Sequence, residues 1–155
     1  MVNKFDKEIV SLLHKASNSA YDPASFEKVV YNFWESNDYF EPTGSGEPFT
    51  IIMPPPNLTG ELHLGHALTV AIEDSLIRWN RMMGKKTLWL PGVDHAAIAV
   101  NAIVEKKLNA DGIDRKALGR EKFLKKIWEF VGDSRERIAA QHRRLGASAD
   151  WKREK

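Results

Sequence analysis

The stretch ProProProAsnLeuThrGlyGluLeuHisLeuGlyHis, residues 54–66, is the segment from which we predict the fold of this chain. A compact apolar run at residues 49–53 precedes it, and the prolines that open it cannot continue a β-ladder. Beyond it, apolar residues recur every three or four positions up to Gly84, a residue type that suits the position after a helix. The sequence therefore predicts a buried strand over residues 49–53 and a long helix over residues 63–83.

A second strand and helix follow the first pair. Residues 87–90 form a short apolar run that a Pro-Gly pair ends, and an apolar pattern over residues 98–108 predicts another helix. Two further helices are predicted after Asp114, with stripes at Phe123, Ile127, Trp128 and Val131 in one and at Ile138 and Leu145 in the other. Alternating strands and helices are typical of a parallel sheet, and two strands are fewer than the usual four to six. The chain thus resembles the front part of a larger α/β domain.

Residues 1–47 are predicted to form an N-terminal helical arm, separate from an α/β unit over residues 48–155. Asp22 followed by Pro23 predicts the start of an amphipathic helix that ends near Ser36. The first twenty residues before it are predicted to be a loosely attached arm.

The composition places the chain among folded proteins without disulfides. Its 155 residues are 43% apolar and include no cysteine, which argues against intrinsic disorder and excludes a disulfide framework. No membrane span or long apolar signal core is present, so we predict a cytoplasmic protein with no membrane contact.

The charge is unevenly distributed along the chain. Residues 1–50 carry four basic and eight acidic groups, a net −4, whereas residues 51–155 carry nineteen basic and thirteen acidic groups, a net +6. This asymmetry permits a polyanionic partner without requiring one.

The residues best suited to catalysis or ligand binding follow the end of the first strand. Ligands of open α/β sheets bind at this edge, and the N-terminus of the following helix attracts phosphate. We expect Gly60 to adopt a turn closed to other residues and Gly65 to let a ligand approach the backbone. His63 and His66 are three positions apart, so both are predicted to point into one cleft and to donate hydrogen bonds to phosphoryl oxygens as neutral rings.

Other interpretations of these residues remain open. The two histidines could be ordinary surface residues, or half of a zinc site completed by Glu61, Asp94 or His95. Asp94, at the end of the second strand, could meet a cationic ligand or simply cap the next helix. The tryptophans and methionines are assigned to the core, namely Trp79, Trp89, Trp128 and the four Met residues.

The stretch 54–66 closely resembles the signature of class I aminoacyl-tRNA synthetases that is usually named HIGH, and its flanks resemble the valyl-tRNA synthetases in particular. The resemblance continues through GlyLysLysThrLeuTrpLeuProGlyValAspHisAla at 84–96, GlyArgGluLysPhe at 119–123 and the ArgArgLeuGlyAlaSer to AspTrp segment at 143–151. It covers essentially everything from Tyr21 to the last residue.

This resemblance implies the N-terminal half of a Rossmann-like catalytic domain. Such enzymes use ATP, with Mg²⁺, and valine to form valyl-adenylate, and then transfer the valyl group to tRNA(Val). His63 and His66 match the catalytic histidines, and no structural metal is implied. The positions matched to ATP binding are Asn57, Gly60, His63, Gly65 and His66. The positions matched to valine binding are Pro54, Pro55, Asn57 and Asp94, with Asp94 holding the ammonium group.

The sequence departs from the family pattern in several respects. It contains no LysMetSerLysSer-type loop, so we expect this chain to supply only the HIGH-motif half of the site and to form adenylate slowly. Val93, Ala97 and Asn101 also differ from the residues common in the family. A catalytically silent α/β module that retains ATP or tRNA-acceptor binding is the alternative. A half-domain also leaves a sheet edge exposed, through which copies of the chain could self-associate.

Overall fold

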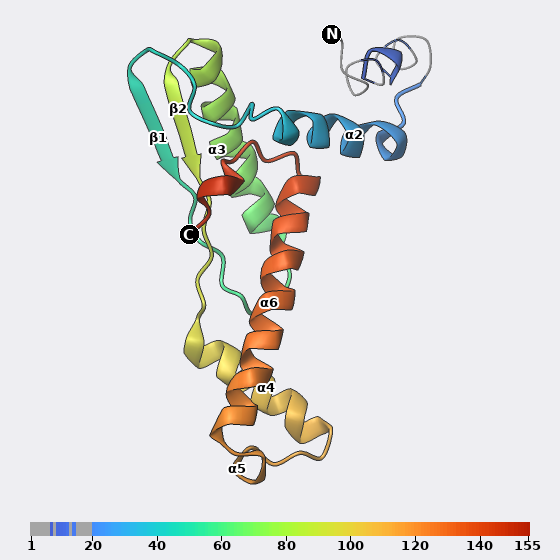
Figure 1. The fold of residues 1–155 in the computed structure, drawn as a ribbon, viewed down its shortest axis with the longest axis vertical. Helices are drawn as coiled ribbons and strands as arrows, with labels where there is room; N and C mark the ends of the chain where they lie inside the picture. Colours follow the sequence, from blue (N-terminus) through green and yellow to red (C-terminus); the bar gives the residue numbers. More distant parts are fainter. Residues whose placement is uncertain (1–6, 8, 13, 15–19) are drawn as a thin grey trace.

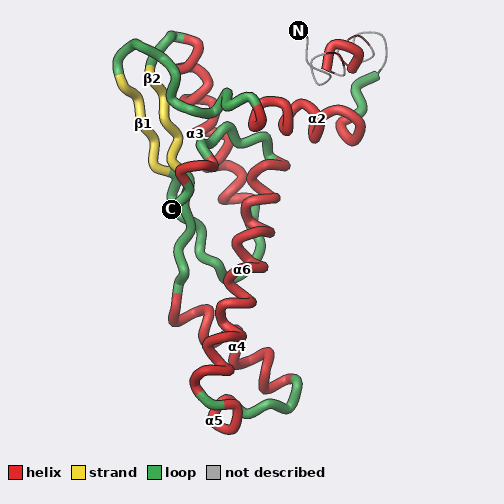
Figure 2. Tube along the Cα trace, viewed as in Figure 1, coloured by secondary structure: helices red, strands yellow, loops and turns green. Residues whose placement is uncertain are grey.

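The computed structural model describes residues 7, 9–12, 14 and 20–155. Its elements, labelled in Figure 1, are α2 (Pro23–Ser36), β1 (Pro48–Ile52), α3 (Leu64–Met82), β2 (Lys86–Leu90), α4 (Ala97–Ala110), α5 (Arg115–Leu118), α6 (Arg120–Arg144) and the 3₁₀ turn η1 (Trp151–Arg153). The arm predicted for the first twenty residues lies largely outside the described part of the chain. The molecule is elongated, with the sheet and α3 at one end and the α4–α5–α6 hairpin at the other (Figure 2).

The two strands pair in parallel, and α3 connects them, which confirms the predicted α/β class. The register aligns Pro48 with Lys86 and Ile52 with Leu90. Trp89 is completely buried, and its Nε1 donates a hydrogen bond to Glu73 of α3. However, alternate residues of β1 face solvent, and Ile52 is 70% exposed. The prediction of a buried first strand is therefore wrong, because α3 covers only one face of this two-stranded sheet.

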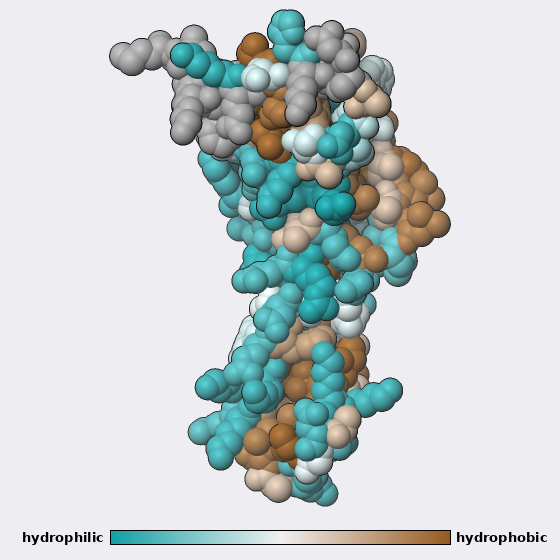
Figure 3. All heavy atoms as spheres, turned by 90° about the vertical axis from the view of Figure 1, so that its right-hand side faces the viewer, coloured by the Kyte–Doolittle hydropathy of each residue, from teal (hydrophilic) through white to brown (hydrophobic). Residues whose placement is uncertain are grey.

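The long helix α3 has the predicted length but turns the predicted apolar stripe outward. Its buried residues are Val70, Ile77 and Asn80. The predicted stripe, which we call the α3 apolar stripe, is exposed and consists of Leu64, Leu68, Ile72, Leu76, Trp79 and Met83. Apolar side chains accordingly reach the surface in this upper part of the molecule (Figure 3).

The core assignment of the tryptophans and methionines is only partly right. Trp89 and Met53 are buried, whereas Trp79, Trp128, Met82 and Met83 are exposed, and Met1 lies outside the described residues. Periodicity identifies an apolar face but does not say which face a neighbouring element covers.

Residues 120–144 form one helix of 25 residues, α6, where the sequence predicted two. Ser134 is 1% exposed and lies between Val131 and Ile138 on the buried face. A small polar side chain at this core position interrupts the apolar pattern without interrupting the helix, which explains the wrong prediction. The following Gly146 has φ +81°, the left-handed conformation expected at a helix end.

Two hydrophobic clusters organise the described part of the chain. The lower cluster joins the β1–α3 loop, α4 and α6, and consists of Leu58, Val100, Val104, Leu108, Phe123, Ile127, Val131 and Ile138. The upper cluster joins the sheet, α3 and the C-terminal segment, and consists of Met53, Val70, Ile77, Trp89, Ala147 and Ala149. The C-terminal segment runs beside β2, since Asp150 N–H donates to Trp89 O and Lys155 N–H donates to Pro91 O.

Helix α2 begins as predicted and packs against the end of α6. The Asp22 carboxylate accepts a hydrogen bond from Ala24 N–H at the start of α2. Tyr31, the buried residue of α2, donates to Ala147 O at 2.7 Å, and Glu35 forms a bidentate ion pair with Arg143. The acidic N-terminal helix is thus attached to the basic C-terminal part, and the boundary at residue 47 remains a prediction.

Candidate functional site

The chain segments that follow β1 and β2 stay paired beyond the strands. Asn57 and Asp94 form a parallel backbone bridge. Asp94 N–H donates to Pro56 O, and Leu58 N–H donates to Asp94 O, both at 2.9 Å. This pairing brings the carboxyl ends of both strands together, as the sequence predicts for neighbouring parallel strands.

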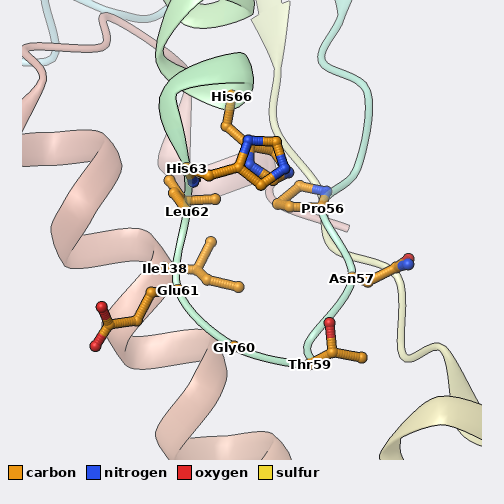
Figure 4. A pocket seen from close by; sticks show the side chains of 9 residues that line it. All are labelled: Pro56, Asn57, Thr59, Gly60, Glu61, Leu62, His63, His66 and Ile138. Atoms are coloured by element: carbon orange, nitrogen blue, oxygen red, sulfur yellow. The ribbon is translucent and has the colours of Figure 1, made fainter.

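A pocket of about 240 Å³ lies where the loop after β1 enters α3 (Figure 4). It is lined by Pro56, Asn57, Thr59, Gly60, Glu61, Leu62, His63, His66 and Ile138. Four of these are predicted site residues, namely Asn57, Gly60, His63 and His66. The other predicted positions, Pro54, Pro55, Gly65 and Asp94, do not line it.

Five lining residues were not assigned to the ATP or valine site from the sequence. Four of them, Pro56, Thr59, Glu61 and Leu62, lie within residues 54–66. The motif therefore located the pocket but did not show which of its residues line it. Ile138 comes from α6, 75 positions after His63, and only its place in the apolar stripe of that helix could have indicated it.

His63 is the N-cap of α3, with the extended backbone angles φ −118° and ψ 176°. Its Nδ1 accepts a hydrogen bond from Gly65 N–H at 3.1 Å. One of the N–H groups at this helix end is therefore already satisfied by the histidine itself.

His66, in the first turn of α3, completes the pair. Its Nδ1 accepts a hydrogen bond from His63 N–H at 3.2 Å, and the two ring centroids are 4.0 Å apart. Figure 4 shows the two rings together at the top of the pocket, with Pro56 opposite. The structure thus brings both histidines to one cleft, although His63 is a cap and does not share a helical face with His66.

These hydrogen bonds define the chemistry that the pair can offer. A neutral imidazole whose Nδ1 accepts a hydrogen bond carries its proton on Nε2, so each ring presents an N–H donor. Burial lowers the pKa of His66 first, and the neighbouring His63 lowers it further. A neutral donor pair at the positive end of a helix suits an anionic ligand.

The two glycines of the motif differ from expectation. A Cβ at Gly65 would lie 2.9 Å from His63 Cε1, so this glycine makes room for the imidazole. Gly60 lacks a positive φ, and a Cβ there would meet nothing within 4 Å. The predicted special turn at Gly60 is therefore wrong.

Asp94 is exposed and does not cap the next helix. Its Oδ1 accepts a hydrogen bond from Ala96 N–H at 2.8 Å, whereas the N-cap of α4 is Ala96, with φ +44°. The capping interpretation of Asp94 is wrong. Within the described residues, no hydrogen bond engages its Oδ2, which leaves that oxygen for a cation.

The zinc interpretation gains no support from the described residues. Among them, no group of three or more His, Cys, Asp or Glu side chains is arranged to hold a metal ion. Nor does any helix in the described ranges combine the length and apolar character needed to cross a membrane.

Comparisons with known proteins identify relatives of this chain. Valine–tRNA ligase from Dehalococcoides mccartyi (strain CBDB1) is 58% identical over 137 residues, and that from Acinetobacter baylyi is 52% identical over 137 residues. These alignments cover 87% and 88% of this chain but only 16% and 14% of the relatives, so the chain spans about one-sixth of their length.

A solved structure confirms the fold. The chain superimposes with a TM-score of 0.64 on LeuRS in the ternary LeuRS-tRNA-LeuAMS complex of Agrobacterium radiobacter K84, at 20% identity, covering 87% of this chain and 16% of that one. Residues 29–155 match the family described as tRNA synthetases class I (I, L, M and V). The predicted resemblance is confirmed, and the chain belongs to the class I tRNA synthetase family.

Proposed function

We propose that this chain forms the ATP- and valine-binding half of a valine–tRNA ligase site, which makes valyl-adenylate for transfer to tRNA(Val). The observation that carries the proposal is the pair of imidazoles, His63 and His66, which accept hydrogen bonds from backbone N–H groups at the N-terminus of α3 and line the pocket. The identity of 49–58% to valine–tRNA ligases supports the choice of valine.

The histidine pair would bind the phosphates of ATP. Both Nε2–H groups are free of the helix cap, and each would donate a hydrogen bond to a phosphoryl oxygen. Donors fixed before the reaction stabilise the charge that develops on the α-phosphate when the valine carboxylate attacks it and pyrophosphate leaves. Mg²⁺ would enter with ATP, held by the phosphate oxygens, and neutralise part of their charge.

The paired strand ends would bind valine. The free Oδ2 of Asp94 would accept a hydrogen bond from the ammonium group, while Asn57 lies beside it in the backbone bridge. Pro54 and Pro55 are exposed and stand outside the pocket, so Pro56 is the proline best placed to contact a ligand there.

The size of the pocket limits what this chain holds alone. Sites for whole small-molecule ligands usually occupy roughly 300–1,000 Å³, more than the volume of about 240 Å³ found here. The pocket therefore suits the phosphate chain better than a complete adenylate. Because a lost transition-state donor costs roughly 3–4 kcal/mol, and the sequence has no LysMetSerLysSer-type loop, slow turnover is expected.

The tRNA would meet the basic side of the molecule. Helix α6 carries eight Lys and Arg against four Asp and Glu. Such an excess attracts nucleic acid through phosphate contacts, with an affinity that falls as salt increases.

Calorimetry separates this function from a silent ATP- or tRNA-binding module. The proposal predicts that ATP binds the chain, that valine binds it, and that His66→Ala weakens ATP binding much more than valine binding. A silent module would bind ATP or tRNA without any detectable affinity for valine.

A further inference from the structure

One side chain of α6 reaches the loop that leads into the histidine pair. Gln141 Oε1 accepts a hydrogen bond from Leu62 N–H at 2.9 Å, across 79 positions of sequence. Gln141 is half-buried and does not line the pocket. Leu62 lies outside any helix or strand, so without this acceptor its N–H would have no partner within the described residues.

The hydrogen bond between Leu62 and Gln141 matters because Leu62 lies next to the histidine pair. Leu62 directly precedes His63, the residue whose imidazole caps α3 and whose N–H reaches His66. The loop before it is held at its other end by Leu58, which is fully buried and donates to Asp94 O. Between these two attachments lie residues 59–61, where a Cβ at Gly60 would meet nothing within 4 Å. The Leu62 side chain packs against the lower cluster, and the bond to Gln141 fixes the Leu62 backbone next to the cap.

Helix α6 is a firm support at this point. Ile138 and His142, on either side of Gln141, are 2% and 4% exposed. Arg143 holds the same turn to α2 through its bidentate ion pair with Glu35. Because this turn of α6 is held in place, the Gln141 side chain that it carries can hold Leu62 in one position.

We propose that Gln141 is a positioning residue, whose amide oxygen fixes Leu62 and thereby places His63 and His66 in register for the ligand. It does not touch the reacting atoms. The geometric part of this inference stands on the structure alone, and its consequence for turnover rests on the proposed function.

Hydrogen exchange by NMR tests the geometric part without any activity. The amides that matter are those of Leu62, His63 and Gly65, because each donates to one link of the arrangement. In the unmodified chain, Leu62 N–H should exchange at least about tenfold more slowly than an unprotected amide. Exchange of Leu62 at the unprotected rate would overturn the proposal, and this measurement needs no variant.

Two substitutions of similar size separate positioning from general stability. Gln141→Met removes the acceptor, and should speed exchange at Leu62, His63 and Gly65 by about tenfold or more while leaving Val70 and Ile77 in α3 unchanged. Gln141→Glu keeps an acceptor oxygen and should restore protection at all three. A merely structural role would instead speed exchange throughout the core. Unchanged protection of His63 and Gly65 in Gln141→Met would overturn the proposal.

Valine-dependent exchange of pyrophosphate into ATP then tests the consequence for turnover. Gln141→Met should lower kcat by about ten- to a hundredfold with little change in the KM for valine, since misplacement of about 1 Å has effects of this size. Glu136→Gln, an exposed change on the same helix, should leave kcat unchanged. If the unmodified chain shows no exchange activity, the proposed function fails, while the amide measurements still decide the role of Gln141.

Discussion

The imidazole of His63 occupies the space that a side chain at Gly65 would fill. A Cβ at Gly65 would lie 2.9 Å from Cε1 and 3.1 Å from Nδ1 of His63. Because the ring is the end of a side chain that can rotate away, Gly65→Ala should displace the ring and leave the helix intact. We expect little change in the free energy of unfolding, because the gain of about 0.5–1 kcal/mol from replacing a helical glycine offsets the loss of the His63 cap, about 0.5–2 kcal/mol, while pyrophosphate exchange falls at least about tenfold.

Gly132→Ala is the matched control for this prediction. Gly132 lies within α6, and a Cβ there would meet nothing within 4 Å. This variant should gain about 0.5–1 kcal/mol of stability with unchanged exchange activity. Full activity in Gly65→Ala would show that the position of the His63 ring does not matter.

Asp94→Asn should weaken valine binding specifically. The substitution removes the charge that would face the ammonium group but keeps an oxygen that can accept from Ala96 N–H. Hydrogen bonds to charged groups contribute about 1.5–3 kcal/mol, so valine affinity should fall roughly 10- to 150-fold with ATP affinity unchanged. Calorimetry measures both, with Asp111→Asn as the control at another exposed carboxylate. Equal loss of both ligands would argue against an ammonium site at Asp94.

Stability should fall as the pH decreases through 6.5. The pKa of His142 is lowered chiefly by burial and further by His66 and Arg143, against a hydrogen bond to the Ile138 backbone and the charge of Glu154, which raise it. Because the unfolded histidine, with its pKa of 6.5, takes up a proton before the folded one, stability present above pH 6.5 is lost below it. One such group contributes at most about 1.4 kcal/mol per pH unit.

Urea denaturation between pH 7.5 and 5 measures this effect. The unmodified chain should lose stability over this range, and His142→Gln should show a smaller slope. His95→Gln, at an exposed position, is the control variant. An identical slope in His142→Gln would exclude His142 as the source.

The α3 apolar stripe should drive self-association of this chain. Monomeric proteins rarely expose contiguous apolar patches larger than a few hundred Å², and Leu64 alone is 85% exposed. Sedimentation should detect dimers or larger species at micromolar concentration, and a double change of Leu68→Lys with Ile72→Lys should shift them to monomer. Ala102→Lys on the exposed side of α4 should not. Monomeric behaviour of the unmodified chain at every concentration would contradict this prediction.

The sequence predicted the local elements better than their environments. Proline, glycine and capping signals located α2, α3 and both strands to within one or two residues, because those signals act on the nearby backbone. Burial was predicted less well, since Trp79 and Ile52 belong to apolar patterns whose outer faces no described element covers. The single helix α6 was missed because Ser134 interrupts its stripe.

The candidate site shows the same division. The motif placed His63 and His66 at one cleft, although the two meet as the N-cap and a first-turn residue of α3 and not on one helical face. The hydrogen bonds from backbone N–H groups at the N-terminus of α3 to the two rings depend on side-chain rotation. The contact of Gln141 with Leu62 joins positions 79 residues apart. Neither follows from spacing within a single segment.

Valine-dependent exchange of labelled pyrophosphate into ATP is the decisive measurement of adenylate formation by this chain. At high protein concentration, the unmodified chain should show slow exchange that requires valine, and His66→Ala and Asp94→Ala should each reduce it to background. Exchange that stays at background in the unmodified chain would contradict the claim that this chain forms valyl-adenylate.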